Sequence, residues 1–121
     1  MDSITEQTAE TFVVAFVTVP NQNVAVNLAR TLVQEKLVAC VNIVPGVRSI
    51  YAWQGKLCDD LELLCVLKTR RELFPALCDR VSALHPYEVP EVIALPLLAG
   101  HAPYLAWLQE ETRGLGAVDV K

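Results

Sequence analysis

The sequence lacks the features that mark several common classes of protein. No apolar run approaches the roughly 18 residues that a membrane-spanning helix needs. The first residues, MDSITE, have neither the basic segment nor the apolar core of a secretory signal. Lys and Arg number 10 against 14 for Asp and Glu, and they form no basic stripe of the kind that binds nucleic acid. We therefore expect a cytoplasmic protein with neither a membrane nor a nucleic acid as its partner.

Catalytic and zinc-binding motifs are also missing. The chain has two histidines, and it has neither a Gly-rich phosphate loop nor the nucleophile elbow of hydrolases. Its four cysteines form no Cys-x-x-Cys pair, and none stands beside a histidine, so a zinc site is poorly supported. We predict that the protein is not an enzyme and that most of its cysteines are reduced, small, buried residues.

Apolar side chains, in contrast, are abundant. They make up 53% of the 121 residues, and charged residues make up 20%. The first value is slightly above the usual range for a soluble domain and the second slightly below it. A lone domain of this size has a large surface to cover with polar groups. The excess therefore predicts a second buried surface, such as a subunit interface.

The hydrophobic pattern predicts alternating strands and helices. Strands are expected at 12–19, 38–53, 57–68 and 89–97, and helices at 22–36, 70–84 and 103–112. The first strand does not alternate between apolar and polar residues, which indicates that both of its faces are covered. Proline cannot donate to a strand ladder, so Pro45-Gly46 predicts a bulge or sharp bend. Gln54-Gly55 predicts the tight turn of a long hairpin.

Local signals also predict how the helices begin. Asn21 is expected to cap the first helix. Thr69 and Glu72 have the spacing of a capping box, with Thr69 as the N-cap of the second helix. Pro75 then either kinks the first turn or marks the first position of a later start. The last helix is expected to bury Tyr104, Leu105 and Leu108.

The order β-α-β-β-α-β with a terminal helix predicts an α+β, ferredoxin-like fold. It gives a four-stranded antiparallel sheet with both crossover helices on one face. We expect a single domain over 12–112, with a flexible leader at 1–11 and a flexible tail at 113–121. The strands are apolar on the other face too, and burying each large apolar side chain is favourable by roughly 1.5–3 kcal/mol. We therefore predict that the terminal helix and a neighbouring subunit cover that face.

Six segments closely resemble the divalent-cation tolerance (CutA) family, and they follow the family's order across residues 12–111. They are VTVPN (17–21), LVACVNIVPGV (37–47), YAWQGK (51–56), LKT (67–69), LHPYEVPE (84–91) and YLAWL (104–108). The resemblance implies a ferredoxin-like subunit in a tight homotrimer whose hairpin arms wrap onto neighbouring chains, an architecture similar to that of the PII signalling proteins. It also implies a role in tolerance of divalent cations, with Cu(II) or another divalent ion bound, no metal needed for folding, and no established enzymatic activity.

His85 is the main candidate metal ligand, because imidazole suits copper and zinc. Glu88 offers oxygen ligands nearby, and Cys40 offers a thiolate. The alternative is that His85 caps a helix and bonds a carbonyl, and that Cys40 belongs to the core. Some family members have a cysteine at the position of Val17 and a second histidine at that of Leu84, both tied to copper. This chain lacks both, so a copper site of that form is not expected.

A second candidate site consists of Tyr51, Trp53, Lys68 and Glu91. Tyr51 and Trp53 are two apart on a strand and so share a face, and aromatic residues with a polar tip suit pockets and interfaces. Lys68 ends an apolar strand and needs water, a carboxylate or an anion. These residues predict an inter-subunit cleft for a small ligand; the alternative is that they only hold the trimer together. Two hypotheses follow: a metal-binding tolerance protein, or a ligand-binding scaffold with incidental metal.

Overall fold

The structure is a computed structural model that describes residues 11–113. The first ten residues of the expected leader, and all but the first residue of the expected tail, lie outside this range. The described chain folds into β1 (Phe12–Val19), α2 (Gln22–Gln34), β2 (Cys40–Trp53), β3 (Lys56–Arg70), a 3-10 turn η1 (Arg71–Leu73), α3 (Phe74–Leu84), β4 (Ile93–Pro96) and α4 (Ala102–Glu111). Within these residues, no helix combines the length and apolar character needed to cross a membrane.

The four strands form one sheet in the order β2-β3-β1-β4. All the pairings are antiparallel, as the order of elements predicts. β1 lies inside the sheet, where Val14 pairs with Lys68 of β3 and with Leu95 of β4. Both edges of β1 are therefore paired, which makes it a central strand of the sheet.

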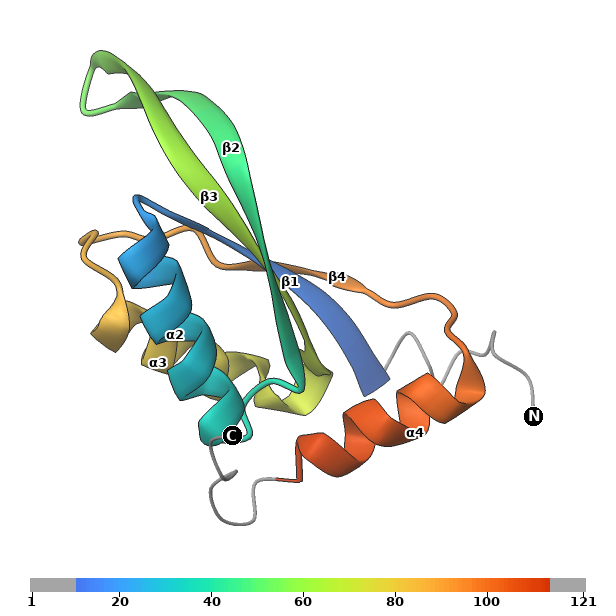
Figure 1. The fold of residues 1–121 in the computed structure, drawn as a ribbon. Coiled ribbons are helices and arrows are strands. Elements are labelled where there is room, and N and C mark those ends of the chain that lie inside the picture. The colour runs from blue at the N-terminus through green and yellow to red at the C-terminus, as the bar shows by residue number, and fades with distance from the viewer. Residues whose placement is uncertain (1–10, 114–121) are drawn as a thin grey trace.

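Helices α2 and α3 cover one face of the sheet (Figure 1). The main core lies between them and the strands, and its members are mostly Val and Leu. It includes Val17, Val19, Leu28, Leu32, Leu67, Leu77 and Val81, all almost completely buried. The apolar stripe of α2 at four-residue spacing is what brings Leu28 and Leu32 into this core.

The opposite face, which we call the open face, is also apolar and is only partly covered. It carries Val14 and Phe16 of β1, which are half-buried, beside Ile93 and Leu95 of β4, which are 54% and 55% exposed. Helix α4 covers one end of it, where Phe12 packs against Leu105 and Leu108. The expectation that the terminal helix covers part of this face is confirmed. Ile93 and Leu95 have no such cover within the described chain.

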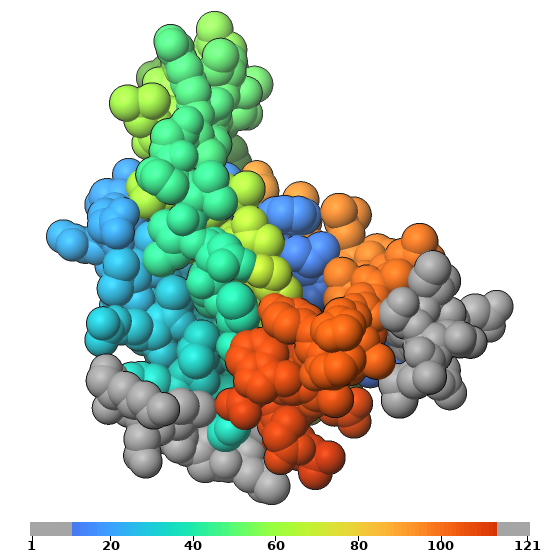
Figure 2. Space-filling model, turned by 45° about the vertical axis from the view of Figure 1, so that its right-hand side comes forward, coloured from blue at the N-terminus to red at the C-terminus, as the bar shows by residue number. Residues whose placement is uncertain are grey.

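The hairpin of β2 and β3 extends well beyond the other strands as an arm (Figures 1 and 2). The expected bulge lies between Val44 and Val47, where Gly46 adopts a positive φ of 79°. At the tip, Gln54 and Gly55 have φ of 50° and 78°, the left-handed pair that matches the twist of a two-residue hairpin turn. Both the bulge and the turn were predicted from the sequence.

The predicted capping box at the start of α3 is wrong. Thr69 continues β3, is fully buried, and donates its hydroxyl to the Leu37 carbonyl at 2.7 Å. Glu72 instead forms an ion pair with Arg70. The α-helix begins only at Phe74, and Pro75 lies in its first turn, where its missing N–H costs nothing. The later start allowed by Pro75 is the correct alternative, because tertiary burial of Thr69 overrides the local motif.

Other boundaries also differ from the predictions. β4 is shorter than the expected 89–97, since Pro90 cannot donate to the ladder and the chain runs as a loop until Ile93. α2 ends at Gln34 rather than Lys36, because Lys36 turns left-handed (φ 61°) and closes a Schellman motif.

Tyr104, which was expected to be buried, is 40% exposed. Only the side of α4 that carries Leu105 and Leu108 packs against the sheet.

The cap of α2 gives a direct test of this fold. Asn21 is extended, and its side chain accepts a 2.9 Å hydrogen bond from the N–H of Val24. We expect Asn21→Ala to lower the free energy of unfolding by about 1 kcal/mol, measured by denaturant titration at fixed protein concentration. Asn23→Ala is the matched control, because Asn23 is exposed in the first turn; it should be neutral or slightly stabilising. Equal losses in both variants would contradict the capping role.

Candidate functional site

A cavity of about 610 Å³ lies between the arm and the loop that joins α3 to β4. We call it the arm cleft. Its lining includes Tyr51, Trp53, Glu62, Tyr87, Glu88 and Glu91. The volume lies within the usual range for small-molecule sites, and a lining of aromatic side chains with a few polar groups is typical of them. The arm supplies the two neighbouring aromatic residues because Tyr51 and Trp53 point to the same face of β2.

The floor of the arm cleft contains a buried carboxylate. Glu62 of β3 is only 5% exposed, and its Oε2 accepts a 3.0 Å hydrogen bond from the hydroxyl of Tyr87. Burial, together with this bond to a carboxylate, raises the pKa of Tyr87 to about 12. The phenol therefore stays neutral and keeps donating to Glu62 throughout the physiological range of pH.

A second tyrosine–carboxylate pair lies on the arm itself. The hydroxyl of Tyr51 donates to Oδ2 of Asp60 on the paired strand at 2.6 Å. This hydrogen bond raises the pKa of Tyr51 above its usual value. The bond ties the Tyr51 side chain across the hairpin, so the ring is positioned before any ligand arrives.

His85 fastens the loop that forms the other wall. Its Nε2 lies 2.8 Å from the Thr18 carbonyl of β1, and its Nδ1 accepts the N–H of Tyr87 at 3.1 Å. A nitrogen that accepts carries no proton, so Nε2 carries it and donates to Thr18: a neutral imidazole. The ring also packs on that of Tyr87, with centroids 4.7 Å apart. His85 thus holds Tyr87 over Glu62.

The lining of the arm cleft is acidic. Glu62, Glu88 and Glu91 line it, and no Lys, Arg or His is among the described residues that do so. Arg48 is near in sequence, but its register places it on the opposite face of the arm, where it forms a two-pronged ion pair with Asp59 at 2.8 Å. Arg48 is therefore directed away from the cleft. Lys56 pairs with Trp53 and shares its side of the arm near the tip, but it does not line the cleft.

Residues 13–111 match the family model described as CutA1 divalent ion tolerance protein. The chain belongs to this CutA1 family. The resemblance carried by the six sequence segments is thus confirmed, and with it the α+β class with a four-stranded antiparallel sheet.

Relatives from distant organisms have similar sequences, and a solved relative has a similar fold. The chain is 54% identical over 99 residues to "Divalent-cation tolerance protein CutA" of Thermus thermophilus, covering 82% of this chain and 96% of the other. It is 50% identical to human "Protein CutA". That match covers 84% of this chain and 56% of the human protein. The solved CutA1 structure from Oryza sativa superposes with a TM-score of 0.83 at 50% identity, covering 88% of this chain and 97% of that one. The family is named for tolerance of divalent ions and not for a reaction.

The predicted metal ligands do not meet within one chain. Among residues 11–113, no group of three or more His, Cys, Asp and Glu side chains could hold a metal ion. Both ring nitrogens of His85 are engaged in hydrogen bonds. Cys40 lies across the sheet from Val14, whereas His85 bonds Thr18, four residues or about 13 Å farther along β1. Glu88 lines the arm cleft instead. The metal role of these three residues stays a prediction.

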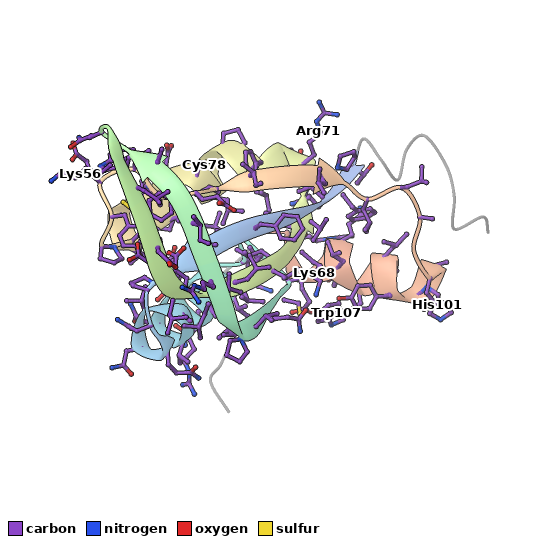
Figure 3. The ribbon with its side chains drawn as sticks, turned by 90° about the horizontal axis from the view of Figure 1, so that it is seen from above. Lys56, Lys68, Arg71, Cys78, His101 and Trp107 are labelled. Atoms are coloured by element: carbon purple, nitrogen blue, oxygen red, sulfur yellow. The ribbon has the colours of Figure 1, made fainter. Side chains whose placement is uncertain are left out.

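Three of the four predicted cleft residues come together, and Lys68 does not. Tyr51, Trp53 and Glu91 line the arm cleft within a single chain. Lys68 lies at the α4 end of the sheet, far from the arm tip marked by Lys56 (Figure 3). There its ammonium contacts the Asn42 side chain and lies 4.0 Å from the Cys40 sulfur. The register explains the separation, because Lys68 pairs with Cys40 at the start of β2 and not with the arm.

Sequence reasoning missed Glu62 and Tyr87 as site residues. Glu62 is an acidic residue on the even-numbered side of β3, at the base of the arm. One signal was available. Glu62, Asp60 and Cys58 share that side of β3, which lies beside the side of β2 that carries Ser49, Tyr51 and Trp53. The contact with Tyr87 had no such signal, because it depends on how the loop folds back over the sheet.

The Tyr87–Glu62 contact predicts an abnormal tyrosine titration. We expect the difference between the 295 nm absorbance titrations of wild type and Tyr87→Phe to have its midpoint near pH 12 in the folded protein and about 10 in denaturant. Because the folded-state pKa is raised, the associated stability is present below pH 10 and is lost as the pH rises toward 12. A folded-state midpoint near 10 would show that Tyr87 does not donate to Glu62.

Proposed function

We propose that the protein acts in tolerance of divalent metal ions as a ferredoxin-like homotrimer, similar in architecture to PII proteins, that binds copper or another divalent cation. The match of residues 13–111 to the CutA1 family carries this proposal. Relatives named "Divalent-cation tolerance protein CutA" occur in both Thermus thermophilus and Escherichia coli. The proposed role is binding rather than catalysis.

The open face supports self-association. Ile93 and Leu95 of β4 remain 54% and 55% exposed on this face, and on the other side of the arm Leu57 and Leu61 are 80% and 77% exposed. Exposed apolar side chains grouped on one face, as on β4, are typical of an interface. A closed homo-oligomer would bury this surface on every subunit, with the arm reaching a neighbouring chain.

The metal ligands are proposed to come from more than one subunit. The donors of a single chain do not converge, and a metal ion at His85 would have to replace one of its two hydrogen bonds. An imidazole held as a neutral ring is nonetheless in the protonation state that copper and zinc require. Carboxylates such as Glu88, or the Cys40 thiolate, would complete the site from a neighbouring chain.

We also propose that the protein works in the cytoplasm. Cys40, Cys58, Cys65 and Cys78 are all free thiols. Burial raises the pKa of the Cys65 thiol to about 11, so it stays protonated and unreactive in the core. Free thiols are the state that a reducing compartment maintains.

A ligand-binding scaffold is the second candidate function, and the arm cleft is the observation that favours it. Its volume and aromatic lining suit a small molecule. In this case metal binding would be incidental, and the cleft would be the functional site.

The trimer can be tested at the open face. We expect light scattering of the wild type to report about three times the 13.3 kDa of one chain. Leu95→Lys should reduce this mass toward that of a monomer, because burying an unpaired ammonium in an apolar interface is unfavourable by several kcal/mol. Ala83→Lys is the control, since Ala83 is exposed on α3 on the other side of the sheet. A monomeric wild type would exclude the assembly.

Metal binding can be tested with the two histidines. Titration calorimetry with Cu(II) and Zn(II) should give a defined ratio per subunit for wild type. His85→Ala should lose this binding, and His101→Ala, which alters an exposed histidine at the start of α4 (Figure 3), should retain it. Circular dichroism would establish that both variants are folded. Weak, equal binding by all three proteins would mean that His85 is structural and would favour the scaffold function.

A further inference from the structure

The arm cleft combines three features that select one class of ligand. The first is its charge. Glu62, Glu88 and Glu91 line it without a lining cation among the described residues, and Glu62 is 5% exposed. Charges in a shielded cavity act through a lower effective dielectric than charges on an open surface, so this cleft attracts cations and repels phosphates and carboxylates.

The second feature is the pair of fastened aromatic rings. The hydroxyls of Tyr51 and Tyr87 are both committed to carboxylates, at 2.6 Å and 3.0 Å. What these residues offer a ligand is therefore the ring surface. Trp53, beside Tyr51 on the same face of the arm, is 45% exposed and adds the largest aromatic surface. Aromatic faces attract ammonium groups and also pack against methylene chains.

The third feature is the spread of the negative charges. No three His, Cys, Asp or Glu side chains within residues 11–113 converge closely enough to hold a metal ion. A bare divalent ion needs such convergence, with ligand distances near 2.0–2.6 Å. The carboxylates are instead distributed around a cavity of about 610 Å³, which is far larger than one ion requires. A ligand with separated positive charges and an apolar connection fits this arrangement.

We propose that the arm cleft binds an aliphatic polyamine, a linear molecule with two or more ammonium groups joined by methylene chains. The ammonium groups pair with Glu62, Glu88 and Glu91, and the methylenes lie against Trp53 and the tyrosine rings. This inference rests on the ligand-binding function proposed above and does not require a metal ion at His85.

Spermidine is the probe, titrated by calorimetry into the intact protein at physiological salt and with a chelator present to exclude metal effects. We expect saturable binding of spermidine and none of the uncharged 1,8-octanediol. Mg²⁺, titrated without chelator into metal-free protein, should bind much more weakly, because a metal ion makes no contact between methylenes and the aromatic rings. Comparable binding of Mg²⁺ would mean a diffuse acidic surface rather than a site, and would overturn the proposal.

Two matched pairs of variants locate the binding. Trp53→Leu should weaken spermidine binding roughly tenfold or more, whereas Trp107→Leu, which removes a similarly exposed tryptophan from α4, should not. Glu62→Gln should weaken it by a similar factor, and Asp79→Asn, the same loss of charge at an exposed site on α3, should not. Trp53 is exposed, so its variant remains informative even if Glu62→Gln unfolds. Equal effects within each pair, or no spermidine binding, would refute the proposal; copper binding through His85 would be unaffected.

Discussion

The apolar character of both faces of the central strands constrains the rest of the molecule. Side chains alternate across a strand, so β1 can be buried on both sides only if something covers each face. Helices α2 and α3 cover one face of β1, where Ala15, Val17 and Val19 are fully buried. Helix α4 covers only the Phe12 end of the other, which leaves Ile93 and Leu95 half-exposed. The core between the sheet and its two helices is therefore buried within one subunit, whereas apolar side chains of the open face stay exposed. Covering them would require a neighbouring subunit.

The arm is the second consequence of the same sheet. β2 and β3 continue beyond β1, so their outer halves have no neighbouring strand. The bulge at Val44–Val47 and the left-handed turn at Gln54-Gly55 give the arm its bend and its end. Its two faces carry different groups. Arg48 pairs with Asp59 on one, and Tyr51, Asp60 and Glu62 lie on the other, with Lys56 at the tip. An acidic, aromatic cleft forms where the second face meets the loop held by His85.

Much of this fold could be predicted because its signals are local. The strand of 12–19, the cap at Asn21, the bulge and the hairpin turn depend on residues adjacent in sequence, and the structure has each of them. The errors occur where the position of a residue depends on contacts with residues far away in the sequence. Thr69 has the local form of a helix cap but is buried as the end of a strand. Lys68 seemed to belong with Tyr51 and Trp53, yet register places it beside Cys40.

The six matching segments indicate the family, and periodicity and turn chemistry, which act over a few residues, indicate the elements and the apolar second face. Which side chains meet depends on the folded chain. The contact of Tyr87 with Glu62 joins residues 25 apart, and that of His85 with Thr18 joins residues 67 apart. Such contacts depend on strand register and on the path of a loop, which are fixed by packing of the whole sheet rather than by any local pattern.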